Sequence, residues 1–476
     1  MRPGNAAPPT ATGKTLSTRR PAIDHVLELL SGHAVSLSLQ QFPAAVVHQT
    51  RRLVIDTLGC AIGSYHMQPP AIARGHALES VCPQGSTILG TRHRTAPELA
   101  AFANGVMARY LDFNDTSSAA QGGHPSDNIM AVLAAAEYAG ADLQDTLAGI
   151  VVAYETHNRL AETCNVRVNG WDNAVYVVIA SAAGAGRAMR LDRTQMANAL
   201  ALAAVPNASM NQTRVGALSM WKGCAAGNAG RNGVFAALLA RRGLTGPAQA
   251  FEGPLGFGKQ LGTSLQLPAF GGNGVPFAVE TAQFKCFPCD HEAQCAVTPA
   301  LQLHHALQGK LDQIEQVDIE TYAFALKIAA DGSDKWHPVN RETADHSIPY
   351  VVAVALSTGK VWIDDFEETR ILNPDLQALM QKIRVRASEE CTSQWPLALP
   401  FRITVTTRSG ETHVREVRYA KGHPLNPMTD AEIEAKFLKL AAPVMGQSAA
   451  ERALGALWRL EQIGNVREIL ALFALD

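Results

Sequence analysis

The chain has 476 residues, of which 47% are hydrophobic and 18% are charged, and its 41 Lys and Arg nearly balance its 43 Asp and Glu. At roughly 100 to 200 residues per domain, this length suggests roughly two to four domains, each able to bury its own core. The near-zero net charge provides no field that would draw the protein onto nucleic acid or an anionic membrane, so we expect neither as a partner. The longest apolar stretches, such as 197–205 and 234–240, are far shorter than the roughly 18 to 20 residues of a membrane-spanning helix.

The first 20 residues are rich in Pro, Thr and Ala and carry basic residues, with no acidic residue before Asp24. We expect a disordered tail at 1–20. Its lack of acids resembles a transit peptide, whereas the apolar segment of a secretory signal is missing. The eight cysteines are irregularly spaced, which indicates reduced thiols rather than a disulfide framework. We therefore expect the cytoplasm as the compartment, with the mitochondrial matrix as the alternative.

From residue 21 to about residue 272, helix-length apolar patterns rich in Ala and Leu alternate with short breaks at Gly, Asn or Asp. This pattern predicts a domain of packed helices at 21–272. The stretches 180–189 and 223–243 lack large side chains, which lets helix backbones approach closely, so we place these helices in the middle of the bundle. The predicted helices are 44–62, 96–111, 127–139, 143–163, 175–189, 193–205 and 225–242.

A stretch rich in Gly and Pro ends the helical pattern and predicts a domain boundary near residue 272. Alternation of apolar and polar residues at 314–322 and 401–419 then indicates strands, and Arg408-Ser409-Gly410 supplies a hairpin turn. We therefore expect a smaller α+β domain at 273–426.

Helical periodicity returns at 427–476, and we expect these C-terminal helices to rejoin the first bundle. The fold class that follows is mainly α, with one large helical domain and one smaller α+β domain. No phosphate-binding glycine loop is present, because no strand precedes the Gly-containing stretch 184–193.

The densest polar cluster among the apolar helices spans residues 110–128. Asp112 and Thr116 are four residues apart, and His124 closes a short loop before the next predicted helix. An acid, a hydroxyl and an imidazole that converge where two central helices end form a plausible acid/base site. The structural alternative is helix capping, with an aspartate that hydrogen-bonds a buried histidine.

Two lysines lie where a charge is unexpected. Lys222 begins the helix of small residues, and Lys285 lies between Phe284 and Phe287 at the domain boundary. An ammonium group in such surroundings faces a cavity or a counterion, and two of them beside a histidine would suit a substrate with several carboxylates. Alternatively, each lysine has a purely structural role.

Cys286, Cys289, His291 and Cys295 have a spacing reminiscent of a zinc site. Pro288 lies inside the CxxC pair, no second paired knuckle follows, and a domain of this size does not need a metal to fold. We therefore predict no metal.

Residues 341–346 place four charged or titratable side chains just before a long apolar helix that carries Tyr350. A phenol on such a helix must find a polar partner when it is buried. The alternative for the preceding residues is that Asp345 and Ser347 cap the helix and that Arg341 pairs with a neighbouring acid. The four side chains are Arg341, Glu342, Asp345 and His346.

Taken together, these segments resemble the MmgE/PrpD family, which includes 2-methylcitrate dehydratase and cis-aconitate decarboxylase. The resemblance spans nearly the whole chain and implies a large helical domain built from both chain ends, a smaller inserted α+β lid, and a homodimer. It also implies a cofactor-free site in the cleft between the two parts. The motifs that carry it are IDTLGCAIG (55–63), LDFNDT (111–116), HPSDNI (124–129), WKGCAAGNAGRNG (221–233), FKCFP (284–288) and RETADHSIPYVVAVAL (341–356).

By motif position, the resemblance assigns catalytic positions to Asp112, Thr116, His124, Lys222, Lys285 and Tyr350. We add Asn173, Arg341 and His346, with the two lysines, as candidates for substrate binding. Asn173 is a departure, because it stands where methylcitrate dehydratases usually carry a candidate catalytic histidine, and an amide cannot titrate.

The function expected from this resemblance is that of a carbon–oxygen lyase that dehydrates 2-methylcitrate or a related 2-hydroxy tricarboxylate. His124 would be the main acid/base group, tuned by Asp112, and Thr116 and Tyr350 would hydrogen-bond the substrate. Lys222 and Lys285 would stabilise the enediolate. The alternatives are decarboxylation of cis-aconitate, epimerisation of an amino- or imino-dicarboxylate, and a noncatalytic homologue that binds a tricarboxylate.

Overall fold

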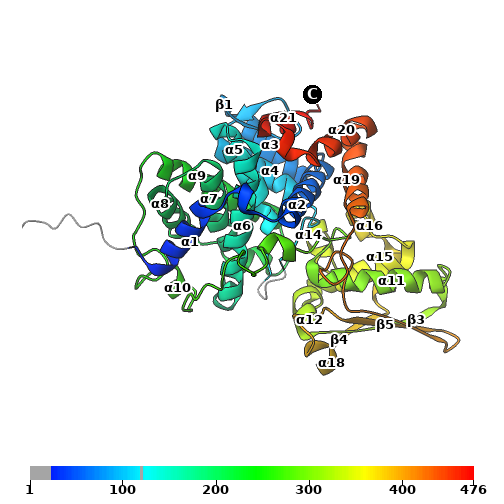
Figure 1. Ribbon diagram of the computed structural model, residues 1–476. Helices are drawn as coiled ribbons and strands as arrows, with labels where there is room; N and C mark the ends of the chain where they lie inside the picture. The colour runs from blue at the N-terminus through cyan, green and yellow to red at the C-terminus, as the bar shows by residue number, and fades with distance from the viewer. Residues whose placement is uncertain (1–22, 118–121, 476) are drawn as a thin grey trace, which may run out of the picture.

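The computed structural model describes residues 23–117 and 122–475, so the tail expected at 1–20 lies outside the described residues. Figure 1 shows a large helical part and a smaller part that holds the main sheet. The prediction of a mainly α fold with a small α+β part is confirmed. No helix among the described residues is both long enough and apolar enough to cross a membrane.

The helical part contains all seven helices that the apolar pattern predicts, with ends that differ by a few residues. The largest shift is at α9, which begins at Trp221 rather than at residue 225. The helices are α1 (His25–Ser36), α2 (Ala44–Gly63), α3 (Gln68–Leu78), α4 (Pro97–Arg109), α5 (Ile129–Ala139), α6 (Leu143–Thr163), α7 (Ala174–Ala188), α8 (Arg193–Ala204), α9 (Trp221–Arg241) and the short α10 (Phe257–Gln260).

Small residues bring the central helices into close contact. A side-chain carbon on Gly105 of α4 would lie 2.9 Å from Gly227 of α9, and one on Gly233 of α9 would lie 2.6 Å from Ser181 of α7. These distances are shorter than van der Waals contact, so the glycines are needed where the backbones cross.

The helical part also holds a feature that periodicity did not predict. Strands β1 (Val81–Thr87) and β2 (Arg94–Thr95) form a two-stranded antiparallel sheet. Its inner side docks on α5 through polar contacts, because Ser86 donates to the carbonyl of Ala134 and Thr87 donates to the carboxylate of Glu137. Because β1 contacts α5 through polar side chains, its sequence does not show the alternation of apolar and polar residues by which strands are predicted.

The lid contains a four-stranded sheet with the order β4-β3-β5-β6, formed by β3 (Ile314–Thr321), β4 (Ile383–Ala387), β5 (Phe401–Thr407) and β6 (Thr412–Val417). Strands β3 and β4 are parallel, and the other pairs are antiparallel. The hairpin predicted at Arg408-Ser409-Gly410 joins β5 and β6, and Gly410 has a φ of 85°, which glycine adopts without strain.

One face of this sheet is covered by two helices, α11 (Gln294–Ala306) and α15 (Ile348–Thr358), which pack against each other. Alternate residues of β5 are buried, as period-2 patterning requires. The shorter lid helices are α12 (Ala323–Ala329), α13 (Ser333–Trp336), α14 (Arg341–Ala344), α16 (Glu368–Ile371), α17 (Pro374–Met380) and α18 (Glu389–Thr392).

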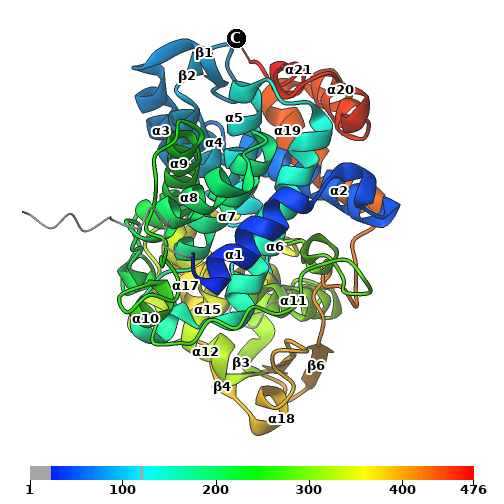
Figure 2. The same cartoon turned by 60° about the vertical axis from the view of Figure 1, so that its left-hand side comes forward.

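After the lid, the chain returns to the helical part, as Figures 1 and 2 both show. The three C-terminal helices are α19 (Asp430–Met445), α20 (Gln447–Leu457) and α21 (Val466–Ala471). Helix α19 packs against α2, where Phe437 lies against Gly59. The two ends of the chain therefore share one core, while the exact boundaries at residues 272 and 427 stay predictions.

Candidate active site

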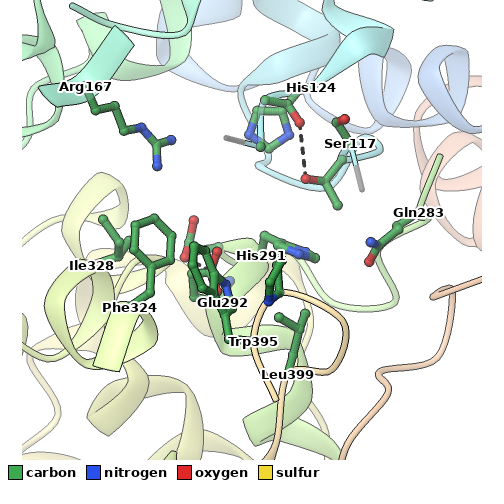
Figure 3. A pocket seen from close by; sticks show the side chains of 15 residues that line it. Ser117, His124, Arg167, Gln283, His291, Glu292, Phe324, Ile328, Trp395 and Leu399 are labelled. Carbon is green, nitrogen blue, oxygen red and sulfur yellow. Dashed lines mark hydrogen bonds between the residues drawn. The ribbon is translucent and has the colours of Figure 1, made fainter. Parts of the chain in front are cut away.

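A cleft between the helical part and the lid is formed by two adjoining hollows, whose linings share His124, Arg167, Asp290 and Ile328. Figure 3 shows the first hollow, with His124 and Ser117 on the helical side and His291, Glu292 and Trp395 on the lid side. We call the first hollow the aromatic lobe. It is lined by Thr116, Ser117, Gly122, Gly123, Gln283, His291, Glu292, Phe324, Trp395, Pro396 and Leu399, with the four shared residues.

We call the second hollow the cationic lobe, because it carries five Arg and Lys side chains against three Asp. It is lined by Arg109, Asn173, Asn211, Arg214, Val215, Gly216, Lys327, Asp331, Asp334, Lys335 and His346, with the same four shared residues.

Behind the wall of the cleft, the carboxylate of Asp112 is fully buried among three cations. Its Oδ1 lies 2.6 Å from Nζ of Lys285 and 2.7 Å from Nη1 of Arg109, and its Oδ2 lies 3.0 Å from Nζ of Lys222. Burial by itself opposes ionisation, but Arg109, Lys222 and Lys285 outweigh it and hold the pKa of Asp112 well below its ordinary value. The residue is therefore a permanent anion.

Asp112 lies three residues after the end of α4 and has a φ of 51°, in the left-handed region. Asp and Asn adopt this region more readily than other residues with a side chain. The turn it forms, closed by the bond from its N–H to the carbonyl of Arg109, brings its carboxylate back toward the guanidinium three residues earlier.

The lid joins the same network through Asp345 and His346. Nζ of Lys222 lies 2.7 Å from Oδ1 of Asp345, which also accepts a hydrogen bond of 2.7 Å from Nδ1 of His346. Asp345 is thus a counterion rather than a helix cap, and Ser347 caps α15 by accepting from the N–H of Tyr350. Burial and the charge of Lys222 lower the pKa of His346, whose ring lines the cationic lobe.

His124 lies at the junction of the two lobes. Its Nδ1 is 2.7 Å from the carbonyl oxygen of Asp115, and its Nε2 is 3.0 Å from Nη2 of Arg109. A carbonyl only accepts and a guanidinium only donates, so Nδ1 carries the hydrogen and Nε2 has the lone pair. Burial and the neighbouring Arg109 lower the pKa of His124 well below its ordinary value, and the imidazole is neutral.

The C-terminal helix α19 contributes Lys436 to a second buried ion pair next to this network. Nζ of Lys436 pairs with Asp56 of α2 at 2.6 Å and donates to the carbonyl oxygens of Phe113 and Lys285, at 2.7 Å and 2.9 Å. One buried ammonium therefore holds together the two segments that carry Asp112 and Lys285.

The structure thus brings five of the sequence-predicted residues into one network: Asp112, His124, Lys222, Lys285 and His346. The two lysines lie behind the wall and do not line the cleft, since their ammonium groups pair with Asp112 and Asp345.

Two further candidates line the cleft directly. The hydroxyl of Thr116 donates to the carbonyl oxygen of Gly123 at 3.2 Å, the bond marked in Figure 3. Asn173 lines the cationic lobe, where its side-chain oxygen accepts a bond of 3.4 Å from Arg214.

Tyr350 and Arg341 lie elsewhere, and neither lines the cleft. The hydroxyl of Tyr350 donates to the carbonyl oxygen of Asp365 inside the core of the lid. The guanidinium of Arg341 lies over the rings of Tyr110, at 5.7 Å, and Phe366, at 5.2 Å, and donates to a lid carbonyl. Arg341 therefore stabilises the contact between the end of α4 and the lid.

Several cleft residues were missed by sequence reasoning. Arg109 could have been found, because it lies three residues before Asp112 at the end of a helix. Arg167 and Lys327 were overlooked although each lies between two apolar residues, Val166 and Val168 in one case and Leu326 and Ile328 in the other. The two residues are far apart in the chain, so nothing local indicates that they share one cleft. Among the described residues, neither side chain forms an ion pair within 4.0 Å, so both charges are available in the cleft.

The cysteines and histidine with metal-like spacing do not form a group of converging ligand atoms in the part of the chain that the structure describes. Cys289 is buried in the lid core, where its sulfur accepts from Gln294, while His291 lines the aromatic lobe. The ligand atoms of Asp112, Asp345 and His346 do lie within 4.8 Å of one another, but Lys222 and Lys285 already occupy these carboxylates. A divalent cation would have to displace two buried ammonium groups, so the donor set does not fit a metal.

Family comparisons agree with this architecture. The MmgE/PrpD N-terminal domain matches residues 28–268, and the MmgE/PrpD C-terminal domain matches residues 287–462. The chain belongs to the MmgE/PrpD family.

Members of this family with curated names are similar over most of the chain. The mitochondrial 2-methylcitrate dehydratase of Yarrowia lipolytica is 32% identical over 85% of this chain and 81% of its own length. The 2-methylcitrate dehydratase of Escherichia coli K12 is 32% identical over 69% of this chain and 71% of its own. The alkylcitrate dehydratase phiI of a fungal species is 26% identical over 82% of each chain.

We predict that Asp112→Asn lowers the free energy of unfolding by about 3 to 5 kcal/mol, because it keeps a residue suited to the left-handed turn but leaves buried cations without their shared anion. Thermal melting of the purified proteins measures the loss. The control is Asp375→Asn, an exposed aspartate in the lid.

The depressed pKa also sets the pH dependence of this loss. Asp112 contributes fully above its ordinary pKa of 3.8, and its contribution disappears only as the pH falls toward the much lower folded value. Equal melting temperatures of the Asp112→Asn variant and wild type at neutral pH would contradict the account of the network.

Proposed function

We propose that the cleft dehydrates a 2-hydroxy tricarboxylate, with 2-methylcitrate as the first candidate, by general acid/base catalysis without a cofactor. The observation that carries this proposal is the pair of cations, Arg167 and Lys327, that face the same cleft as the neutral imidazole of His124. The names of the 2-methylcitrate dehydratases that resemble this chain support the choice of substrate.

The cations would bind the carboxylates of the substrate. Arg167 is partly buried and can form a bidentate contact, and Lys327 supplies a more exposed charge from the lid side. Arg214 and Lys335 already pair with Asp172 and Asp334, at 2.7 Å and 3.4 Å, and would add to the local field. The electrostatic contribution to the binding free energy is therefore larger for a substrate with three negative charges than for one with a single charge.

The chemistry needs a base beside the carbon acid. The proton to be removed is next to a carboxylate, so its loss forms an enediolate with two negative charges, which fixed cations stabilise. Nε2 of His124 has a lone pair and lies at the junction of the lobes, and the substrate would replace Arg109 as its partner. We therefore retain His124 as the main acid/base group.

The hydroxyl leaves as water only if an acid protonates it. Burial and the charge of Asp290 raise the pKa of Glu292 to about 7, so a large fraction of this carboxyl group carries a proton at neutral pH. Glu292 lines the aromatic lobe on the lid side, across from His124, and its carboxyl group accepts a hydrogen bond from Tyr322. We assign it as the proton donor, with Thr116 as a hydrogen-bond donor to the substrate.

We propose the cytoplasm as the compartment, in keeping with the near-neutral chain and its free cysteines.

We predict that the purified protein converts 2-methylcitrate to the unsaturated tricarboxylate and that His124→Ala loses about a hundredfold to ten-thousandfold of the turnover while its fold is retained. NMR in heavy water follows the reaction, and circular dichroism checks the fold. His337→Ala, an exposed histidine of the lid, is the matched control.

The same spectra separate the alternative reactions. Loss of carbon dioxide from cis-aconitate would indicate a decarboxylase, and deuterium exchange without loss of water would indicate an epimerase. Binding of the whole tricarboxylate panel without any turnover would leave a noncatalytic binding protein and refute the dehydratase.

We predict that Arg167→Gln lowers kcat/KM at least tenfold for a tricarboxylate and less for a dicarboxylate that lacks one of the three charges, because the unpaired guanidinium is lost. Steady-state kinetics at constant ionic strength measures both values. Arg384→Gln, an exposed arginine of β4, is the control. An equal loss for both substrates would show that Arg167 is structural.

We also propose a homodimer, which the family resemblance implies. The chain carries exposed large apolar side chains between residues 205 and 235, and Trp221 and Phe235 lie 14 residues apart, nearly four turns, on one face of α9. Light scattering should give twice the chain mass of 50.8 kDa, and the Trp221→Glu/Phe235→Glu variant should shift toward one chain. A monomer at micromolar concentration would refute the proposal.

A further inference from the structure

The aromatic lobe has an apolar wall that acid/base chemistry on a tricarboxylate does not require. Phe324 and Ile328 of α12 and Trp395, which follows α18, line it from the lid side with Leu399. The rings of Phe324 and Trp395 stack with their centroids 5.1 Å apart. Three of these four side chains are partly exposed, so apolar surface faces the cleft instead of the core.

The two lobes differ in charge. In the aromatic lobe, burial and the charge of Lys285 lower the pKa of His291 to about 4, so this ring is neutral, and burial raises the pKa of Glu292 to about 7, which disfavours its charge. The cations of the cleft lie mostly in the other lobe, although Arg167 borders both. A charged carboxylate is therefore favoured on the cationic side and a neutral group on the aromatic side.

The chemistry of the substrate fixes where a neutral group would lie. In a 2-alkylcitrate, the carbon that loses its proton also carries the alkyl branch. The branch is therefore attached to the same carbon atom from which the base removes the proton. His124 lines both lobes, so a substrate with its carboxylates in the cationic lobe directs its branch into the aromatic lobe.

The exposed apolar surface of the lobe favours a branch longer than methyl. The space in the lobe that a water-sized group can enter is about 70 Å³, and its mouth opens to solvent. A methyl group covers only a small part of the surface of Phe324, Ile328 and Trp395. Each further methylene that leaves water for this wall contributes a roughly constant free energy.

We propose that the aromatic lobe binds the alkyl branch of the substrate, and that Phe324, Ile328 and Trp395 select 2-alkylcitrates with branches longer than methyl. This inference rests on the proposed function, because it takes the orientation of the substrate from His124 and the cationic lobe. The three residues are specificity residues and do not take part in proton transfer.

The test compares citrate with its 2-methyl, 2-ethyl, 2-propyl and 2-butyl derivatives, by kcat/KM and by calorimetric Kd. For wild type we expect kcat/KM to rise about fourfold per methylene, and roughly 60-fold from methyl to butyl. Trp395→Ala and Ile328→Asn should each reduce the ratio of butyl to methyl about tenfold. Leu397→Ala, which removes an 81% exposed side chain from the same segment, should leave the ratio unchanged.

The two readouts separate the outcomes. If turnover is independent of the length of the branch, or falls with each methylene, the aromatic lobe does not bind the branch, and the proposed dehydratase activity is unaffected. If binding tightens as the branch lengthens but no substrate is turned over, the dehydratase activity is refuted, and the proposal that the aromatic lobe binds the branch is supported. If no member of the series binds or reacts, both proposals fail, and a ratio that Trp395→Ala and Ile328→Asn leave unchanged places the selection elsewhere.

Discussion

The buried carboxylate of Asp112 is the group on which the architecture of the cleft depends. Three cations meet it, and each would be costly to bury without a counterion. Arg109 comes from α4, Lys222 from α9, and Lys285 from the segment that enters the lid. The pairing that neutralises these charges therefore also fixes the distance between the helical wall and the lid wall.

The positively charged side chains around the cleft are of two kinds, those that form ion pairs and those that do not. Two of the paired cations, Lys222 and Lys285, lie behind the wall and join the helical part to the lid. The cations that face the cleft without a partner among the described residues, Arg167 and Lys327, come from segments with no role in the network. A protein with almost no net charge can in this way present a locally positive surface to an anionic substrate.

The same arrangement explains the state of the histidines. His124 is held between a carbonyl and a guanidinium, which selects one tautomer and keeps the ring neutral. His346 is held by Asp345, whose other contact is Lys222, so its orientation depends on the network behind it. Both imidazoles are therefore oriented by residues of the buried ion-pair network, His124 through Arg109 and His346 through Asp345.

Much of this could be predicted from local patterns. Apolar periodicity located the helices and the β5–β6 hairpin within a few residues, because the faces that pack into a core repeat at the period of the element. It missed β1 and β2, whose docking is polar. Lys222 and Lys285 were found for a related reason, since a charge in apolar surroundings needs a partner, and Asp112 was found in the densest polar cluster between the helices.

The rule that a buried charge needs a partner could not identify which residue that partner is. It flagged Tyr350 as well, and this hydroxyl bonds to a backbone carbonyl within the lid core. It left open whether the lysines face a cavity or a counterion, and the expected mechanism placed them against the substrate, whereas they pair with Asp112 and Asp345. Local residue patterns thus settled which segments fold into helices and strands and which charges must be neutralised, because both depend on near neighbours. Which charges are paired and which face the cleft was decided only by contacts between residues more than a hundred positions apart, such as Lys285 with Asp112 and Lys222 with Asp345.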